Sequence, residues 1–285
     1  MGAGFWGTAI SLALREAGRE VLCLDCDQPG AASPAAAGLV RQSTLDRLAV
    51  SGPRWWTEQH SQACQDFLQW GMAEGWARLG QERIVSDYQP RLRPGLWCVE
   101  CAQLLSLAGA ESGRVVRLEP RSGHWWVETE EGPVQARQVV VAAGFFSDAL
   151  LAASHLPTLG IQPLPGSGLL AQASRPLLEP LTLAYRLTGD TRTRTATARN
   201  WVGNRVRVGD TLEPGEHEQM EVLRQLLEQA GGQGPIVKRW GIRPALVQLC
   251  VEKVAENLVV ASGGKRTGLA TAAGAARRVV DLLSQ

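Results

Sequence analysis

Hydrophobic positions recur at two periods along the chain and so predict both helices and strands. Helical spacing of apolar residues, with small or polar residues between them, favours helices over residues 8–17, several within 44–83, 99–107, 216–230 and 269–283. Apolar alternation and short apolar runs favour strands over residues 20–24, 114–119, 124–129, 134–141, 199–202, 205–209 and 257–261. The mixture predicts an α/β or α+β fold.

The first strand–helix region begins with a glycine motif. Residues 2–7 read Gly-Ala-Gly-Phe-Trp-Gly, a G-x-G-x-x-G that runs straight into the predicted helix. Gly2 permits a tight turn, Gly4 lets the backbone approach a pyrophosphate, and Gly7 lets the helix pack closely on a strand. The helix N-terminus offers free N–H groups to phosphate oxygens. The motif therefore predicts a dinucleotide site.

An acidic residue follows at the expected distance. Asp25 directly follows the predicted strand 20–24, and its carboxylate can accept hydrogen bonds from ribose hydroxyls there. A carboxylate there disfavours a 2′-phosphate, so NADP fits least well among dinucleotides. The motif should also follow a buried parallel strand, yet only Met1 precedes Gly2. Either the true start lies upstream, or the chain lacks the first strand of its sheet.

Two further segments have the pattern of a ligand-binding sheet edge. The apolar run 139–141 suits a strand buried on both faces, and it ends in small residues at 142–144 that leave room for a ligand. The apolar strand 257–261 leads into Ser-Gly-Gly-Lys-Arg-Thr-Gly at 262–268 and then a closing helix. A second helix N-terminus can thus point at the same ligand.

Composition narrows the function classes. The chain has 285 residues with 29 Lys+Arg against 28 Asp+Glu, and this balance argues against general nucleic-acid binding. It has neither an apolar stretch of 18 residues nor a basic leader with an apolar core, so we expect no membrane span and a cytoplasmic location. Its six cysteines are expected to be reduced.

Other residue clusters have plain structural interpretations. The pairs Cys23/Cys26 and Cys98/Cys101 lie too far apart for a typical four-thiolate zinc site, so we predict buried thiols and no metal. Tryptophans and Phe67 in the 44–83 helices are core candidates. Five arginines alternate with small residues and predict a solvated strand face, with attraction of an acidic substrate as the alternative; they are Arg192, Arg194, Arg199, Arg205 and Arg207.

Four motifs in order resemble one family. They are GAGFWG with Asp25, VVVAAGFFSD (139–148), WGIRP (240–244) and SGGKRTG (262–268) before an Ala-rich helix. Together they resemble the FAD-dependent D-amino-acid oxidase superfamily, in particular its glycine oxidase and sarcosine oxidase-like branch. The resemblance implies a Rossmann-like FAD-binding domain, discontinuous over 1–50, 98–160 and 236–285. It also implies a β-rich substrate domain over 51–97 and 161–235.

The resemblance also implies site residues. The predicted FAD-binding residues are Gly2, Ala3, Gly4, Gly7, Asp25, Ser33, Val115, Ala143, Gly144, Gly263, Gly264, Thr267 and Gly268. The predicted catalytic residues are Arg243, Lys265 and Arg266, with Arg243 holding a substrate carboxylate. Tyr185 is a further candidate for a substrate contact.

The chemistry implied by the resemblance is oxidation of the C–N bond of a small amino acid or secondary amine. Hydride passes to the flavin, the imine hydrolyses, and oxygen or another electron acceptor reoxidises the flavin, with peroxide formed from oxygen. A covalent flavin link at Cys250 is a separate, minor hypothesis. The sequence does not specify the amine or the oligomeric state.

Three alternatives stay open. The chain departs from the family pattern in its first strand, in Gly-Gly-Lys at 263–265 and in residues 245–251, so it could be a degenerate relative that binds flavin weakly and has no activity. A flavin enzyme acting on modified nucleic acid and an NAD-linked dehydrogenase are the other two.

Overall fold

A computed structural model describes residues 1–85, 91–175, 177, 180–185, 194–201, 205–210 and 216–285. Several residues with predictions lie outside the described part of the chain. They are Val202 at the end of the predicted strand 199–202, the turn at 203–204 between the two predicted strands, Arg192, and the side chains of Tyr185 and Arg194. None of the described helices is long and apolar enough to cross a membrane.

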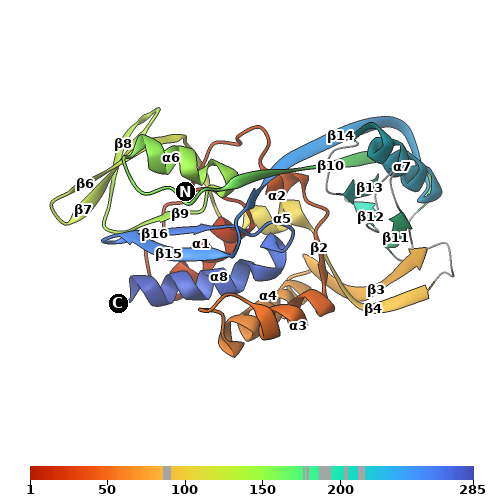
Figure 1. The fold of residues 1–285 in the computed structure, drawn as a ribbon, viewed down its shortest axis with the longest axis horizontal. Helices are drawn as coiled ribbons and strands as arrows, with labels where there is room; N and C mark the ends of the chain where they lie inside the picture. Colours follow the sequence, from red (N-terminus) through yellow and green to blue (C-terminus); the bar gives the residue numbers. More distant parts are fainter. Residues whose placement is uncertain (86–90, 176, 178–179, 186–193, 202–204, 211–215) are drawn as a thin grey trace.

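A small three-stranded sheet of mixed direction lies next to the glycine motif. Strands β15 (Cys250–Ala255), β16 (Leu258–Ser262) and β9 (Val139–Val141) form one sheet, in which β16 pairs parallel with β9. Every residue of β16 is buried, as expected for a strand covered on both faces. Helices α1 (Phe5–Glu16) and α8 (Gly268–Leu283) pack on each other beside it (Figure 1).

The chain start lies between this sheet and strand β1 (Leu24–Asp25). The Met1 ammonium donates to the Val140 carbonyl at 3.0 Å, and the Gly2 N–H donates to the Leu24 carbonyl at 2.8 Å. β1 pairs parallel with β5 (Glu111–Ser112). The predicted strand 20–24 is wrong over residues 20–23, because β1 begins at Leu24. Met1 and Gly2 link β1 to β9 through these backbone hydrogen bonds.

The predicted strands 114–119 and 124–129 are confirmed, and they belong to a β-meander. Strands β6 (Val115–Arg121), β7 (His124–Thr129) and β8 (Gly132–Ala136) form it. The predicted single strand 134–141 is wrong, because the chain leaves the meander after Ala136 and pairs with β16 in another sheet as β9. Apolarity alone does not reveal such a change of sheet.

An eight-stranded sheet forms the other side of the molecule (Figure 1). Its order is β14-β10-β13-β12-β11-β3-β4-β2. The strands in chain order are β2 (Leu39–Arg41), β3 (Ala77–Val85), β4 (Arg91–Val99), β10 (Gln162–Ala173), β11 (Leu181–Tyr185), β12 (Arg194–Trp201), β13 (Arg205–Asp210) and β14 (Gly232–Ala245).

The remaining helices cover these sheets. They are α2 (Ala32–Ala35), α3 (Gln42–Ser51), α4 (Glu58–Ala73), α5 (Cys101–Ser106), α6 (Ser147–Ala153) after a 3₁₀ turn (Gly144–Phe146), and α7 (Glu216–Gln229).

The prediction of helices throughout 44–83 is wrong at the end of this range. Gly75, at φ +78°, follows α4, and residues 77–85 pair with β4 as a strand. Trp76 is fully buried as predicted, whereas Trp70 is 39% exposed.

The predicted solvated arginine face is also wrong at two positions. Arg199 on β12 and Arg207 on β13 are only 2% and 3% exposed. Their neighbours Ala198 and Val208 pack under α7, so the arginines face the opposite side of the sheet. Alternation with small residues did not show that the chain at 34–38 covers that side.

A buried histidine at the N-terminus of α4 should make the stability of the protein depend on pH. His60 is 5% exposed, and its Nδ1 accepts the Thr57 N–H at 3.0 Å, so the ring needs its neutral form. Burial lowers the pKa of His60 below 6.5. The unfolded chain therefore binds more protons, and this contribution to stability is lost as pH falls below 6.5. We expect the melting temperature to fall further between pH 7.5 and pH 5.5 in the wild type than in His60→Gln. Equal decreases in the two proteins would contradict a stabilising role for neutral His60.

Candidate cofactor and substrate cavity

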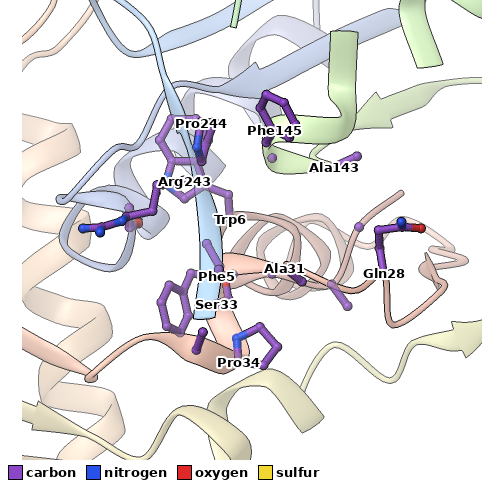
Figure 2. A pocket seen from close by; sticks show the side chains of 18 of the residues that line it. Phe5, Trp6, Gln28, Ala31, Ser33, Pro34, Ala143, Phe145, Arg243 and Pro244 are labelled. Carbon is purple, nitrogen blue, oxygen red and sulfur yellow. Dashed lines mark hydrogen bonds between the residues drawn. The ribbon is translucent and has the colours of Figure 1, made fainter. Parts of the chain in front are cut away.

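A cavity of about 1300 Å³ lies between the sheet that contains β16 and the eight-stranded sheet. It is lined by the start of α1, the loop before β2, the 3₁₀ turn after β9, strand β14 and the turn before α8. Figure 2 shows Gln28 and Arg243 on opposite sides of the view, with Phe5 and Ser33 between them. An elongated ligand can therefore run from the β1 end to the β14 end.

The cavity brings together most residues predicted from the sequence. The predicted residues that line it are Gly2, Ala3, Gly4, Asp25, Ser33, Val115, Ala143, Gly144, Arg243, Gly264, Lys265, Arg266 and Gly268. Gly7, Gly263 and Thr267 do not line it. These assignments stay predictions, since position alone does not establish a contact with ligand.

The glycine motif forms a narrow backbone cradle. A Cβ atom at Gly2 would lie 2.5 Å from the Ala142 carbonyl oxygen, and Gly2 has φ +87°. A Cβ at Gly4 would lie 2.9 Å from Ser33 Oγ. A Cβ at Gly7 would lie 1.7 Å from the Gly2 carbonyl oxygen, so Gly7 acts behind the cavity by letting α1 start against the turn. Without Cβ atoms at these positions, a pyrophosphate can approach the backbone closely, so this cradle suits such a group.

The N-terminus of α1 faces the same part of the cavity. Its first turn carries no acidic residue, and Ser33 Oγ accepts the Phe5 N–H at 3.0 Å. The positive end of the helix dipole and a serine hydroxyl therefore meet there, and both suit an anionic ligand. Trp6 Nε1 donates to the Gly268 carbonyl at 2.8 Å, which ties the start of α1 to the start of α8.

The β1 end of the cavity suits a ribose. Asp25 lies in β1, and its carboxylate makes no hydrogen bond to any residue that the structure describes. It is thus available to accept from hydroxyl groups. Val115, at the start of β6, lines the cavity too; the resemblance implied an FAD contact for it, and that role stays a prediction.

The turn before α8 closes the other end. Lys265 has φ +43°, which is unusual for a residue other than glycine, and its N–H donates to the Pro244 carbonyl at 3.0 Å. Thr267 does not line the cavity, but its hydroxyl donates to the Gly264 carbonyl at 3.0 Å. The turn and β14 are thereby held together.

Arg243 lies on β14 in this end of the cavity. Its Nη2 donates to the Pro165 carbonyl at 3.1 Å. A Cβ at Gly166 would lie 2.0 Å from the same nitrogen, so only glycine there leaves room for the guanidinium. The side chain is therefore placed by two strands, β14 and β10.

Charge is distributed unevenly around the cavity. Among the described lining residues the only acidic ones are Asp25 and Asp27, which lie next to the β1 end. The basic ones away from that end are Arg41, Arg239, Arg243, Lys265 and Arg266. A ligand group near Arg243 therefore meets positive potential, which favours a carboxylate.

Several lining residues were not predicted from sequence. They are Arg41, Phe145, Ser167, Thr197, Arg239 and Trp240, among others. Arg239 and Trp240 adjoin or begin the WGIRP motif and could have been included from that proximity. Phe145 lies inside the VVVAAGFFSD motif and could have been included in the same way. Arg41, Ser167 and Thr197 lie on strands of the large sheet and reach the cavity through sheet pairing.

Arg41 is fixed by a buried carboxylate. Glu82 on β3 accepts Arg41 Nε and Nη2, both at 2.9 Å, and the Thr182 hydroxyl at 2.9 Å. Burial alone would raise the pKa of Glu82, but the hydrogen bonds and charge of Arg41 outweigh it and hold the pKa below its usual value. The carboxylate therefore stays ionised inside the sheet.

We expect Glu82→Gln to lower the free energy of unfolding by about 2 kcal/mol, because it removes a charge-assisted double contact. Since the folded pKa is lowered, the stabilisation is present above pH 4.5 and fades as pH falls through the folded pKa. Urea unfolding at pH 7 and pH 4 measures both effects. Glu119→Gln, at an exposed pair with Arg121, is the matched control and should cost less than about 0.5 kcal/mol.

The comparisons with known proteins decide the family. The sequence profile described as DAO, FAD dependent oxidoreductase, matches residues 88–282, which is more than half of the chain. The chain belongs to this family. No curated protein sequence matches it.

Solved structures agree on the fold. Glycine oxidase from Geobacillus kaustophilus is 19% identical, with 99% of this chain and 93% of that chain covered at a TM-score of 0.71. Iminodiacetate oxidase from Chelativorans sp. BNC1 is also 19% identical, with 99% and 94% covered at 0.72. L-proline dehydrogenase from P. horikoshii is 11% identical, with 99% and 91% covered at 0.71.

This DAO-family chain is therefore an FAD-dependent oxidoreductase, and its fold is the mixed Rossmann-like and β-rich fold predicted from the four motifs. The cavity meets the demands of FAD on three counts. It has a backbone cradle that any Cβ would fill, helix N-termini without acidic residues, and an available carboxylate at the β1 end.

Proposed function

We propose that the chain oxidises the C–N bond of a small amino acid or secondary amine, in the manner of a glycine oxidase. The observation that carries the proposal is Arg243, held on β14 in the basic end of a cavity whose other end suits a nucleotide. The names of the similar structures, glycine oxidase, iminodiacetate oxidase and L-proline dehydrogenase, describe this substrate class.

The predicted residues divide the work of holding the cofactor. Gly2, Gly4 and Ser33 would hold the pyrophosphate, and Asp25 the ribose. The turn over residues 263–268 would meet the flavin end, where the start of α8 favours negative charge. Bound FAD supplies the two-electron oxidising power.

The chain's own side chains would orient the substrate. Arg243 would bind the substrate carboxylate through its planar fork, in place of or beside its contact with Pro165. Lys265 and Arg266 add positive charge at the same end. Phe145 and Phe146, which contact each other edge to face, line the cavity and restrict water there.

The test is peroxide formation and oxygen uptake with glycine, sarcosine, iminodiacetate and proline. L-Lactate, which has a carboxylate but no amine, is the matched control. We expect turnover with at least one amine and none with lactate. Turnover of lactate alone, or a requirement for a nicotinamide, would overturn the proposal.

The second candidate is a relative that retains FAD but has lost turnover. It is favoured by the contact of Arg243 with Pro165, which engages one nitrogen of the guanidinium proposed to bind the carboxylate. It predicts bound flavin that no amine reduces, and anaerobic mixing with the same four amines separates the two candidates.

A further inference from the structure

Two buried arginines connect the large sheet to the cavity wall. Arg199 and Arg207 lie directly opposite each other on β12 and β13. Both are almost fully buried, although burying two like charges side by side costs free energy. Burial also lowers the pKa of Arg207 to about 10, so it remains charged at neutral pH. The two guanidinium groups therefore need polar partners inside the protein.

The partners are four backbone carbonyls and one carboxylate among the contacts that the structure describes. Arg207 donates from Nη1 to the Pro34 carbonyl at 3.4 Å and from Nη2 to the Ala35 carbonyl. Arg199 donates to the Gly38 carbonyl at 3.4 Å and to the Val99 carbonyl at 3.0 Å, and it pairs with Glu100 at 3.5 Å. Pro34 and Ala35 end α2, where helix carbonyls lack partners within the helix.

The held segment is a wall of the cavity. Residues 33–38 all line it, and their side chains are small, Ser-Pro-Ala-Ala-Ala-Gly. Such side chains offer little packing to fix the backbone. Ser33 sits one residue before Pro34, and its Oγ meets the start of α1. The position of Ser33 therefore depends on what holds the carbonyls beside it.

We propose that Arg199 and Arg207 are positioning residues for FAD. They fix the backbone of residues 34–38 from the large sheet, and through it they place Ser33 at the start of α1. This role concerns the cofactor that the family uses and is independent of which amine is oxidised.

Arg207→Met tests the proposal, with two readouts. Titration of flavin-stripped protein with FAD, followed by quenching of flavin fluorescence, should show a Kd raised about tenfold, as expected when one charge-assisted contact is lost. Hydrogen exchange of amides in residues 32–38 should accelerate, with or without FAD. Arg207→Lys keeps the charge but not the fork, and should recover part of both effects.

Val208→Ala is the matched control. Val208 is the next residue of β13 and is fully buried, but it packs under α7 on the other face. It should lower the melting temperature and leave the FAD Kd and the exchange of residues 32–38 unchanged. Wild-type FAD affinity and exchange in Arg207→Met would overturn the proposal. So would an equal loss of FAD affinity in Val208→Ala, since general destabilisation would then suffice.

Discussion

Gly7→Ala is expected to lower the free energy of unfolding by about 3 kcal/mol and to weaken FAD binding. Alanine in place of glycine inside an exposed helix normally stabilises by about 1 kcal/mol. At Gly7 the sign reverses, because the new Cβ would lie 1.7 Å from the Gly2 carbonyl oxygen. Either α1 or the glycine turn must move, and the turn forms the proposed pyrophosphate cradle.

Urea unfolding and FAD titration of the purified variant measure these effects. Gly80→Ala is the matched control, because a Cβ at Gly80 on β3 meets nothing within 4 Å. The control should keep both stability and FAD affinity near wild type. Unchanged or increased stability of Gly7→Ala would contradict the close packing of α1 on the turn.

Arg243→Ala is expected to lower kcat/KM for a carboxylate-bearing amine, mainly by raising KM. The loss should correspond to about 2–4 kcal/mol of transition-state stabilisation. The reason is that the substrate carboxylate would lose its charged fork in the basic end of the cavity. The loss should be much smaller for an amine without a carboxylate. Steady-state kinetics with one substrate of each kind, at saturating FAD, measures the difference.

Lys238→Ala provides the matched control for Arg243. Lys238 is exposed on the same strand and does not line the cavity. Its replacement should leave both substrates unaffected. An Arg243→Ala enzyme with wild-type KM for the carboxylate substrate would remove Arg243 from the proposed substrate site.

The ligand-facing turns could be predicted from sequence because their chemistry is local. Gly2, Gly4 and Asp25 have fixed spacing in one strand–helix unit, and the turn at 262–268 directly precedes its helix. All of these segments reach the cavity. Element types for long periodic segments, such as 216–229 and 268–283, were also predictable.

The remainder depends on contacts between distant segments. The roles of Arg199 and Arg207 depend on residues 34–38, more than 160 positions away, so their alternating pattern resembled a solvated strand. The same holds for Arg41, which reaches the cavity wall through Glu82 on another strand. The break between β8 and β9 was hidden because β-propensity does not specify which sheet a strand joins.

The visible absorption spectrum of the purified protein tests the central claim most directly. It should be recorded as isolated and after addition of FAD and desalting. We expect the two flavin bands to remain with the protein and to bleach when a small amino acid or secondary amine is added without oxygen. Protein that retains no flavin after FAD addition would contradict the assignment of the cavity to FAD, and retained flavin that only NADH or NADPH bleaches would contradict the proposed oxidation.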